Sequence, residues 1–448
     1  MPEGKTVRIA IVGSGISGLT AAYHLADRHE ITVFEGNGYI GGHTNTVEVE
    51  IGAERHAIDT GFIVFNDWTY PNFVRLLDDL GVASRPTSMG FSVRCDASGW
   101  EYSGNSLNSL FSQRRNLLRP RFWRMLADIL RFNRNGGRLL EEIPEDLTVS
   151  EFLRKEKYSR EFGECYLKPM GSAIWSCPLT KFGDFPVKFI LEFYKNHGLL
   201  SVWKRPTWRV IEGGSRSYVT ALTAKFRDRI RLRTPVAGVR RTEEGVLIVL
   251  TNGEVEKFDH VVMACHSDQA LRRLEDATPT EREVLGCFPY ERNVAVLHTD
   301  ESLLPRNRRA WSSWNYHVRG DSTERATVTY CMNILQQIES RQTFCVTLNE
   351  EEGIDPAKVL RRFEYHHPVF TTKRSAAQRR HRELLNVNRT SFCGAYWGNG
   401  FHEDGVVSGL AVVRALEGAH PATTIETRKQ PEMTCQPERC GANGSVGA

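Results

Sequence analysis

The chain has 448 residues, about three times the ~150 residues typical of one domain, so it can form two or three folded units. Its 40% hydrophobic and 25% charged residues are ordinary for a globular protein, and 37 glycines with 18 prolines are too few for a collagenous or low-complexity chain. The 58 Lys and Arg against 54 Asp and Glu leave a net charge of +4, which predicts no whole-molecule affinity for nucleic acid.

Cysteines and hydrophobic segments indicate the compartment. The ten cysteines are scattered without a Cys-x-x-Cys pair or a metal-ligand spacing, so we interpret them as reduced core residues rather than a disulfide framework. The apolar run at residues 9–12 is too short for a signal peptide, and no stretch approaches the ~20 apolar residues of a membrane span. No His and acid spacing repeats on a helix face, so no metal site is predicted. We expect a cytoplasmic protein.

The first 35 residues read as a strand, a glycine-rich turn, a helix and a second strand. Residues 7–12 are mostly β-branched, and residues 9–12 form an unbroken apolar run, as expected of a strand buried on both faces of a parallel sheet. The turn Gly-Ser-Gly-Ile-Ser-Gly follows at residues 13–18, then a helical stretch (19–26) and a strand (31–34) that ends at Glu35. This βαβ unit is the arrangement of a dinucleotide-binding fold.

The three glycines of the turn have separate predicted roles. Gly13 allows the tight turn, Gly15 lets a pyrophosphate approach the backbone, and Gly18 lets the helix pack closely on the strand. Free amide donors at the start of the helix would then hold the phosphates. The predicted contacts come from Gly13, Ser14, Gly15, Ile16, Ser17 and Gly18.

An acidic residue and a second glycine pair indicate which dinucleotide is bound. Glu35 lies 20 residues beyond Gly15 (35 − 15), the spacing at which a carboxylate meets a ribose hydroxyl. Gly41 and Gly42 follow directly, where a purely nicotinamide-binding domain needs no second close approach to a phosphate. FAD is therefore a better fit than NAD(P).

The first fifty residues resemble the flavin-containing amine oxidase and phytoene desaturase superfamily. In that family a Gly-Gly-Arg segment after the ribose-binding Glu contacts the FAD pyrophosphate, and this chain has Gly41, Gly42 and His43 there. An imidazole gives a phosphate less Coulombic support than a permanent guanidinium. The resemblance implies that all three residues contact FAD, with His43 in place of the arginine.

The resemblance extends to the middle of the chain. Residues 59–62 would place Gly61 and Phe62 along the reactive edge of the flavin ring, although the same residues also fit a plain turn. The segment 205–222 resembles the Gly-Gly segment that leads back into the family's FAD domain. By the same likeness, the backbone of Val236 would meet the adenine.

A third block, near the end of the chain, resembles the family's C-terminal flavin motif. A strand closes on Gly394, an aromatic loop follows, and a small-residue helix begins after Asp404 and Gly405. Its first amides, including that of Val406, would point at the flavin's pyrimidine edge and stabilise the negative charge that appears there on reduction. The loop lacks the cysteine that bonds flavin in many amine oxidases, since Cys393 lies in the strand. Bound FAD is predicted to be non-covalent.

Four residues of this block are candidates for catalysis. The motif places Tyr396 and Trp397 near the ring. His402 and Glu403 are candidates for proton transfer next to the flavin, because imidazole titrates near neutrality. The alternative is structural, with Asp404 as the helix N-cap and Glu403 as a partner of the helix dipole.

Because the FAD-binding blocks lie at both ends and in the middle, the FAD domain must be discontinuous. We predict an α/β protein in which a Rossmann-like FAD-binding domain carries an inserted α+β substrate domain, the amine-oxidase-like two-domain fold. The predicted FAD domain comprises residues 1–105, 205–290 and 385–420, and the substrate domain residues 106–204 and 291–384. Residues 421–448 lack periodicity and are predicted to be a disordered tail.

A closer resemblance rests on long and unusual strings at residues 59–66, 69–72, 171–178, 310–315, 330–336 and 392–405. It is to the predicted FAD-dependent oxidoreductases found beside cyclopropane-fatty-acid synthases, and fused to the synthase as the N-terminal domain in plants. It covers about residues 7–420. The resemblance implies a small, lipid-like substrate and suggests a methyltransferase as a candidate partner.

We therefore expect an FAD oxidoreductase that moves a hydride between flavin and an apolar, fatty-acyl substrate, while a nearby side chain handles the proton. Amine oxidation and redox-neutral isomerisation are alternatives. A non-catalytic flavoprotein that serves a lipid methyltransferase is another. Amine oxidation needs an aromatic cage or a carboxylate for the ammonium group, and the sequence assigns no residue to that role.

Residues 113–132 combine many arginines with Trp, Phe and Leu at helical intervals. Such a segment can lie on an anionic membrane, which would make the protein peripheral at the membrane. It can also be a surface helix whose apolar stripe packs on its own domain. The pattern by itself is compatible with both.

Overall fold

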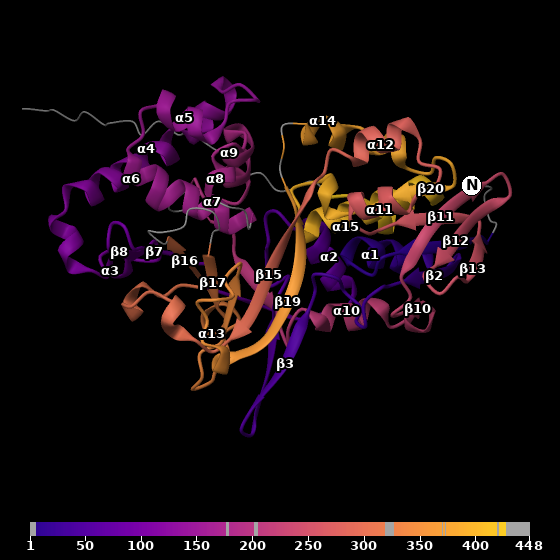
Figure 1. The fold of residues 1–448 in the computed structure, drawn as a ribbon, viewed down its shortest axis with the longest axis horizontal. Helices are drawn as coiled ribbons and strands as arrows, with labels where there is room; N and C mark the ends of the chain where they lie inside the picture. The colour runs from indigo at the N-terminus through magenta and orange to yellow at the C-terminus, as the bar shows by residue number, and fades with distance from the viewer. Residues whose placement is uncertain are drawn as a thin grey trace, which may run out of the picture.

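The computed structural model describes residues 6–175, 179–200, 205–318, 327–369, 371, 373–418 and 421–426. Two parts lie side by side along the long axis, one around a parallel sheet and one built from a mixed sheet and a group of helices (Figure 1). Most of the predicted tail, residues 427–448, lies outside the described residues.

A five-stranded parallel sheet forms the centre of the first part. Its order is β10 (Ile230–Arg231), β2 (Glu30–Phe34), β1 (Arg8–Val12), β14 (His260–Met263) and β20 (Thr390–Phe392). In the register, Ile9 of β1 lies opposite Ile31 on one side and His260 on the other. Segments from the beginning, middle and end of the chain meet in this sheet, as a discontinuous FAD domain requires.

Alternate residues of β1 enter two different cores, which explains the apolar run at residues 9–12. Ile9 and Ile11 pack with four helices, α1 (Ile16–Leu25), α2 (Pro71–Asp79), α10 (Arg216–Thr223) and α15 (His402–Glu417). On the opposite side, Ala10 and Val12 pack with an antiparallel sheet and two helices. The sheet consists of β11 (Val236–Thr242), β12 (Gly245–Leu250) and β13 (Val255–Phe258), and the helices are α11 (Ser267–Arg273) and α12 (Pro279–Leu285). Each fully buried isoleucine contributes about 2 to 3 kcal/mol to folding.

A seven-stranded mixed sheet forms the centre of the second part. Its order is β19 (Val359–Pro368), β15 (Tyr290–His298), β18 (Cys345–Leu348), β17 (Thr327–Cys331), β16 (Trp314–Val318), β7 (Phe91–Cys95) and β8 (Trp100–Ser103). The long strands β15 and β19 run between the two parts of the molecule (Figure 1). Strands β7 and β8 lie inside the predicted 1–105 segment but pair in this sheet, so we propose that they belong to the substrate domain.

Helices cover the remaining part of the second half. They are α3 (Leu107–Leu110), a 3-10 turn η1 (Arg114–Leu118), α4 (Pro120–Glu142), α5 (Val149–Lys155), α6 (Arg160–Phe162), α7 (Lys168–Trp175), α8 (Leu179–Phe182) and α9 (Val187–Asn196). Helix α4 buries Phe122, Met125, Phe132 and Leu139 against its own domain. Within the described residues, we find no helix with both the length and the apolar character needed to span a bilayer.

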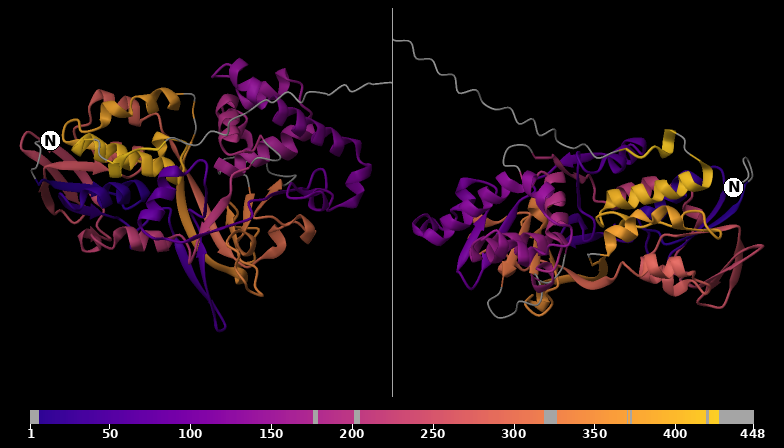
Figure 2. Two further views of the ribbon diagram at one scale, coloured as in Figure 1. Left: turned by 180° about the vertical axis from the view of Figure 1, so that it is seen from behind. Right: turned by 90° about the horizontal axis from the view of Figure 1, so that it is seen from above.

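Shorter elements complete the structure. They are the hairpin β3 (Thr46–Ile51) and β4 (Glu54–Asp59), the small sheet of β5 (Val64–Asn66), β9 (Trp208–Ile211) and β6 (Ser84–Pro86), and helices α13 (Met332–Leu335) and α14 (Arg374–Arg379). The two further views in Figure 2 show α15 lying along α1, so the first and last helices of the nucleotide-binding part are neighbours.

Candidate functional site

The glycine-rich turn between β1 and α1 leaves an opening at one position. Gly13 has a φ of +113°, and a Cβ there would lie 2.8 Å from the carbonyl oxygen of Ala264. A Cβ at Gly18 would lie 2.2 Å from the carbonyl oxygen of Gly13, so only glycine lets α1 come this close. A Cβ at Gly15 would meet no atom of the described residues within 4 Å. The space beside Gly15 can therefore take a phosphate at the start of α1.

Glu35 is fixed beside this turn. Its carboxylate is buried and accepts hydrogen bonds from the backbone N–H of Ser14 (3.0 Å), the Ser14 hydroxyl (2.6 Å) and the backbone N–H of Asn37 (2.8 Å). Gly36, the next residue, lies against Pro235, since a Cβ on it would be 3.5 Å from Pro235 Cβ. Val236 follows Pro235 directly and begins β11, so the start of this strand lies near the segment that carries Glu35.

The second glycine pair lies on top of the first turn. The backbone N–H of Gly41 donates to the carbonyl of Ser14 at 3.0 Å, and Gly41 pairs with Gly15 as an isolated parallel bridge. Gly41 has a φ of +124°, which favours glycine. A Cβ on Gly42 would lie 3.2 Å from Gly15 Cα. Two glycine-rich segments that are distant in sequence thus form one narrow cradle.

Gly61 and Phe62 lie against this cradle at His43. The backbone N–H of Phe62 donates to the carbonyl of His43 at 2.8 Å, and a Cβ at Gly61 would be 2.1 Å from that same oxygen. Asp59, just before them, holds the segment by accepting bonds from the Ser215 N–H at 2.9 Å and hydroxyl at 2.7 Å. Burial raises the pKa of Asp59 to about 6.

His43 belongs to a cluster of imidazole and phenol rings. Its ring centroid lies 5.1 Å from that of Tyr365, 5.2 Å from His367 and 6.1 Å from His266. Burial, reinforced by the neighbouring histidines, lowers the pKa of His43 to about 4 and the pKa values of His266 and His367 to about 3. The buried Nε2 of His43 has no hydrogen-bond partner among the described residues. This nitrogen is available to a group bound beside the cradle, as a donor or as an acceptor according to the tautomer of the neutral ring.

The start of α15 meets the start of α1. A Cβ at Gly405 would lie 2.6 Å from Ile16 Cγ2 and 3.1 Å from Ser17 Oγ. A Cβ at Gly409, one turn later, would lie 2.6 Å from the carbonyl oxygen of Ser17. Because both contacts need glycine, the two helices approach closely and their amino ends face the same place. Val406, between them, is buried.

Two acidic residues of α15 make structural bonds. The helix begins at His402 with Phe401 as its N-cap, so the predicted start after Gly405 and the predicted N-cap role of Asp404 are both wrong. Asp404 is the third helical residue, and its carboxylate accepts the backbone N–H of Phe401 at 2.9 Å, the bond by which a capping box reaches back to the N-cap. Glu403 accepts the Asn72 side-chain amide at 2.6 Å and the backbone N–H of Phe73 at 2.9 Å, at the start of α2. Burial raises the pKa of Glu403. These contacts favour the structural alternative for both residues, and proton transfer by Glu403 stays a prediction.

His402 is buried and tethered. Its ring stacks on Phe62 with centroids 3.4 Å apart, and its Nε2 lies 3.0 Å from both the Thr44 hydroxyl and the Tyr218 hydroxyl. Burial lowers the pKa of His402 well below its ordinary value, so the imidazole is neutral at physiological pH. Sequence reasoning missed Thr44 and Tyr218 because nothing local marks a polar residue that will face a distant helix.

Tyr396 and Trp397 lie in another cluster. Their rings pack on Phe288 with centroids 5.1 and 5.4 Å away, and Trp397 stacks on His381 at 4.1 Å. The backbone N–H of Gly394, just before them, donates to the hydroxyl of Ser408 in α15 at 3.0 Å. The four predicted catalytic residues are therefore divided between two ring clusters rather than gathered in one.

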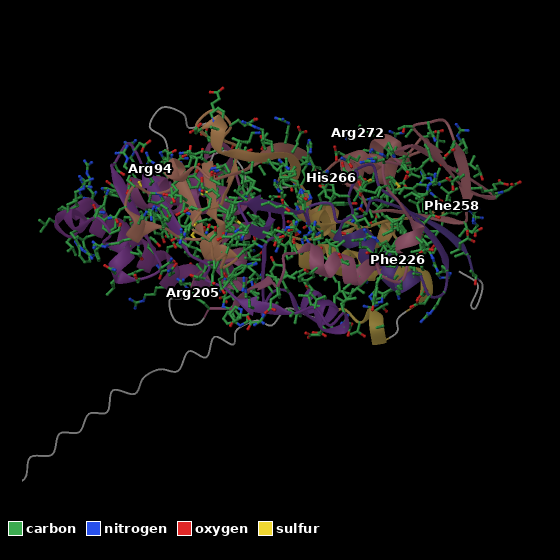
Figure 3. All side chains as sticks on the ribbon, turned by 90° about the horizontal axis from the view of Figure 1, so that it is seen from below. Arg94, Arg205, Phe226, Phe258, His266 and Arg272 are labelled. Atoms are coloured by element: carbon green, nitrogen blue, oxygen red, sulfur yellow. The ribbon has the colours of Figure 1, made fainter. Side chains whose placement is uncertain are left out.

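A cavity of about 550 Å³ lies away from the glycine cradle. It is bounded by the β7–β8 turn, the start of η1 and the loop before η5 (Arg308–Ala310), and its lining includes Arg94, Arg115 and Arg306. Figure 3 shows Arg94 and His266 well separated along the molecule. The cavity is therefore not the dinucleotide site. The described residues contain no His, Cys, Asp and Glu cluster that could hold a metal ion.

Comparison with known proteins identifies the cofactor. The chain matches the family of flavin containing amine oxidoreductases over residues 16–295, which is more than half of its length. The chain belongs to the flavin-containing amine oxidoreductase family. Membership places it among FAD-dependent oxidoreductases and makes FAD the dinucleotide, as the second glycine pair predicted. The open cradle at Gly15 fits the pyrophosphate of this cofactor.

Relatives in this family share the whole fold or part of it. Amine oxidase [flavin-containing] A of Canis lupus familiaris is 23% identical over 283 residues, covering 58% of this chain and 50% of the relative. The chain spans half the length of that curated relative. Cyclohexylamine oxidase from Brevibacterium oxydans has a TM-score of 0.65 at 17% identity, covering 92% and 100% of the two chains. A CLA-producing fatty acid isomerase from P. acnes has a TM-score of 0.62 at 14% identity, covering 91% and 98%. These likenesses confirm the two-domain α/β fold.

Proposed function

We propose that this flavoprotein transfers a hydride between FAD and an apolar, fatty-acyl or lipid substrate. The observation that carries the proposal is the convergence of two glycine-rich segments with the amino ends of α1 and α15, shown by the contacts of Gly42 with Gly15 and of Gly405 with Ile16. When bound, FAD supplies the ring that accepts or returns the hydride. The chain supplies orientation, exclusion of water and electrostatic support.

Particular residues would hold each section of the cofactor. Glu35 would bind the ribose hydroxyls with the lone pairs left by its three donors, and the Val236 backbone would meet the adenine. Amides of the α1 turn would bind the pyrophosphate, and His43 would lie beside it. The amino end of α15, which begins at His402, would favour negative charge on the pyrimidine edge; the predicted direct donors are corrected, because the Gly405 amide is already bonded to the Phe401 carbonyl at 3.1 Å and Val406 lies further inside the helix.

The residues at the start of α15 would act mainly by position. A neutral His402, bonded to the Thr44 and Tyr218 hydroxyls, fixes the ring of Phe62 by stacking. The same three polar groups form a chain of exchangeable protons inside an otherwise apolar core, and such a chain can move a proton without a charged intermediate on the imidazole. We therefore assign the proton-transfer role to His402 rather than to Glu403.

An apolar substrate is favoured by the state of the nearby carboxylates. Asp59, Glu403 and Asp404 each accept bonds from backbone N–H groups, so they are already engaged and poorly suited to receive a substrate ammonium group. Phe401 packs against both the nucleotide-binding core and the helical core, and its ring lies 5.3 Å from that of Phe193. A hydrocarbon chain would pack favourably against aromatic rings at this position. The fatty acid isomerase among the structural neighbours is consistent with it.

Amine oxidation is the second candidate. The family description and the cyclohexylamine oxidase neighbour favour it, since that neighbour's name states an apolar amine. An apolar amine in neutral form needs no carboxylate partner. A redox-neutral isomerisation is a third outcome of the same hydride chemistry, and a methyltransferase partner stays a prediction from the sequence.

A test starts with the purified protein in its yellow, FAD-bound form. Acid precipitation should release the flavin into the supernatant, as expected for non-covalent FAD. Anaerobic mixing with unsaturated fatty acids, phospholipids and cyclohexylamine should bleach the flavin with an acyl substrate and not with the amine. Bleaching by the amine alone would replace the lipid proposal with amine oxidation. Product formation from an acyl chain without net bleaching would indicate isomerisation.

A further inference from the structure

Most of the exposed large apolar side chains in the described part of the chain lie in one short region. Eight such residues are more than a third exposed, and five of them fall between residues 107 and 130. The five are Leu107 (76% exposed), Leu117 (46%), Leu118 (88%), Trp123 (48%) and Leu130 (61%). Single exposed apolar residues are normal on a protein surface, but a cluster marks an interaction site.

The helix geometry explains why these residues face outward together. Helix α4 turns Phe122, Met125 and Phe132 into its own domain. Trp123 and Leu130 are seven residues apart, which places them two turns apart on the opposite face. The indole N–H of Trp123 donates to the carbonyl of Leu117 at 2.9 Å, so η1 and the outer face of α4 are joined. We call this set, with Leu107 and Leu118, the α4 outer surface.

The same region is strongly basic. Residues 107–138 contain eight arginines and one acidic residue, Asp128. Among the arginines, ion pairs join Arg121 to Glu161, Arg131 to Asp128 and Arg138 to Glu142. Arg124 and Arg134 are exposed, lie on the outer side of α4, and have no carboxylate partner among the described residues. Arg115 and Arg306 add further positive charge where the 550 Å³ cavity adjoins η1.

We propose that the α4 outer surface docks on a bilayer that contains anionic lipids. Exposed leucines and a tryptophan beside unpaired arginines match the interface of such a membrane, where apolar side chains enter the acyl boundary and arginines meet phosphates. A nucleic acid would use the arginines but would leave four leucines in water. In Figure 1, α3 and α4 lie at the end of the molecule away from β1 and α1, so docking there leaves the nucleotide-binding part clear of the membrane.

The experiment uses the full-length, FAD-bound protein and flotation with vesicles of phosphatidylcholine, with and without a third of phosphatidylglycerol. Wild-type protein should float only with the anionic vesicles, and binding should weaken as salt is raised. Arg124→Gln with Arg134→Gln should weaken partitioning by about tenfold or more. Leu118→Ser with Leu130→Ser should weaken it by about fivefold or more, because both side chains contribute apolar area.

Matched control variants test whether vesicle binding depends on the α4 outer surface or only on the overall charge and hydrophobicity of the protein. Arg227→Gln with Arg282→Gln removes two exposed arginines elsewhere, and Val255→Ser with Val387→Ser removes two exposed apolar residues elsewhere. Both controls should float like the wild type, and the flavin absorbance of every variant should show that the fold is intact. If the controls and the α4 variants weaken floating equally, the proposal is wrong.

Two other occupants give different results. If size-exclusion chromatography shows a dimer that Leu118→Ser with Leu130→Ser dissolves, and vesicles are not bound, the surface binds a second copy of the chain. If single-stranded RNA binds in a way that needs Arg124 and Arg134 but not Leu118 and Leu130, the surface binds nucleic acid. Either result would overturn the membrane proposal. None of these measurements depends on which substrate the flavin oxidises.

Discussion

Gly409 lies so close to Ser17 that a Cβ on it would be 2.6 Å from the Ser17 carbonyl oxygen. The two residues are 392 positions apart in sequence (409 − 17), yet their contact sets the distance between the last helix and the first. Because α15 cannot retreat without opening the core around it, the amino ends of α1 and α15 are held together. The cofactor site depends on this close helix packing.

Gly15→Ala should separate cofactor binding from folding. A Cβ at Gly15 meets no described atom within 4 Å, and its φ of −72° suits alanine, so the free energy of unfolding of the apoprotein should change by less than about 1 kcal/mol. The methyl group would occupy the space proposed for the pyrophosphate. FAD affinity, measured by quenching of flavin fluorescence, should fall by about tenfold or more.

Gly18→Ala is the matched comparison, with the opposite expectation. Its Cβ would lie 2.2 Å from the carbonyl oxygen of Gly13, so the helix must shift and the apoprotein itself should lose about 1 to 3 kcal/mol of stability. Urea unfolding of both apoproteins distinguishes the two positions. Unchanged FAD affinity in Gly15→Ala would place the pyrophosphate elsewhere.

The histidine cluster should make the apoprotein lose stability in acid. The pKa values of His43, His266 and His367 are lowered to about 4, 3 and 3, whereas in the unfolded chain a histidine takes up its proton near pH 6.5. The folded state therefore binds fewer protons, and its stability decreases as the pH falls from about 6.5 toward about 4. Each histidine should contribute a loss of about 1 to 2 kcal/mol by pH 5.

Urea unfolding of His367→Gln across this pH window checks the prediction. The variant should lose less stability in acid than the wild type. His366→Gln is the matched control, because its side chain is 41% exposed at the neighbouring position. If the free energy of unfolding falls equally with pH in the wild type and in His367→Gln, burial does not oppose protonation of His367 and the prediction is wrong.

Glu403→Gln tests whether this residue is structural or catalytic. Glu403 accepts bonds from Asn72 and from the Phe73 N–H at the start of α2, where a negative charge is favourable. The variant should lose about 1 to 2 kcal/mol of stability and should couple to Asn72→Ala in a double-mutant cycle. A normal free energy of unfolding combined with a flavin reduction rate lowered about a hundredfold would instead support proton transfer by Glu403.

His402→Gln tests whether the imidazole of His402 acts in its neutral form. Burial keeps the pKa of His402 well below its ordinary value, so its imidazole is neutral at physiological pH. The variant should slow the reduction of the flavin by substrate. The pH profile of this reduction rate should show the same ionisations as in the wild type. Tyr218→Phe, which removes one of the two hydroxyls at Nε2, should have a smaller effect in the same direction. Loss of an acidic limb in His402→Gln would contradict this.

Local patterns were enough to predict the nucleotide-binding half. The strand, turn and helix around Gly13 to Gly18 need only neighbouring residues to form, and Glu35 follows at a fixed spacing because strand and helix lengths are fixed by geometry. The family assignment confirms the cofactor that these residues predicted. The predicted strand before Gly394 is likewise present as β20, in the same sheet as β1.

Other features could not be read locally. Tyr365 and His367 meet His43 because they lie on β19, which pairs with β15 and returns to the cradle, and no sequence spacing encodes that approach. Strands β7 and β8 join the second sheet because β7 pairs with β16, more than two hundred residues later. Tyr396 and Trp397 share a loop with His402, yet they enter another core.

The amino-acid sequence by itself determined the dinucleotide fold and the cofactor, because glycine, strand and helix preferences act over a few neighbouring positions. Tertiary structure alone decided which polar and aromatic groups gather around His43 and His402. It also decided whether Glu403 and His402 are free or already bonded, and which face of α4 remains in water. These outcomes depend on packing between segments that are hundreds of residues apart. Burial and close contact in that packing change the chemistry of a side chain, and the residues next to it in sequence do not determine those contacts.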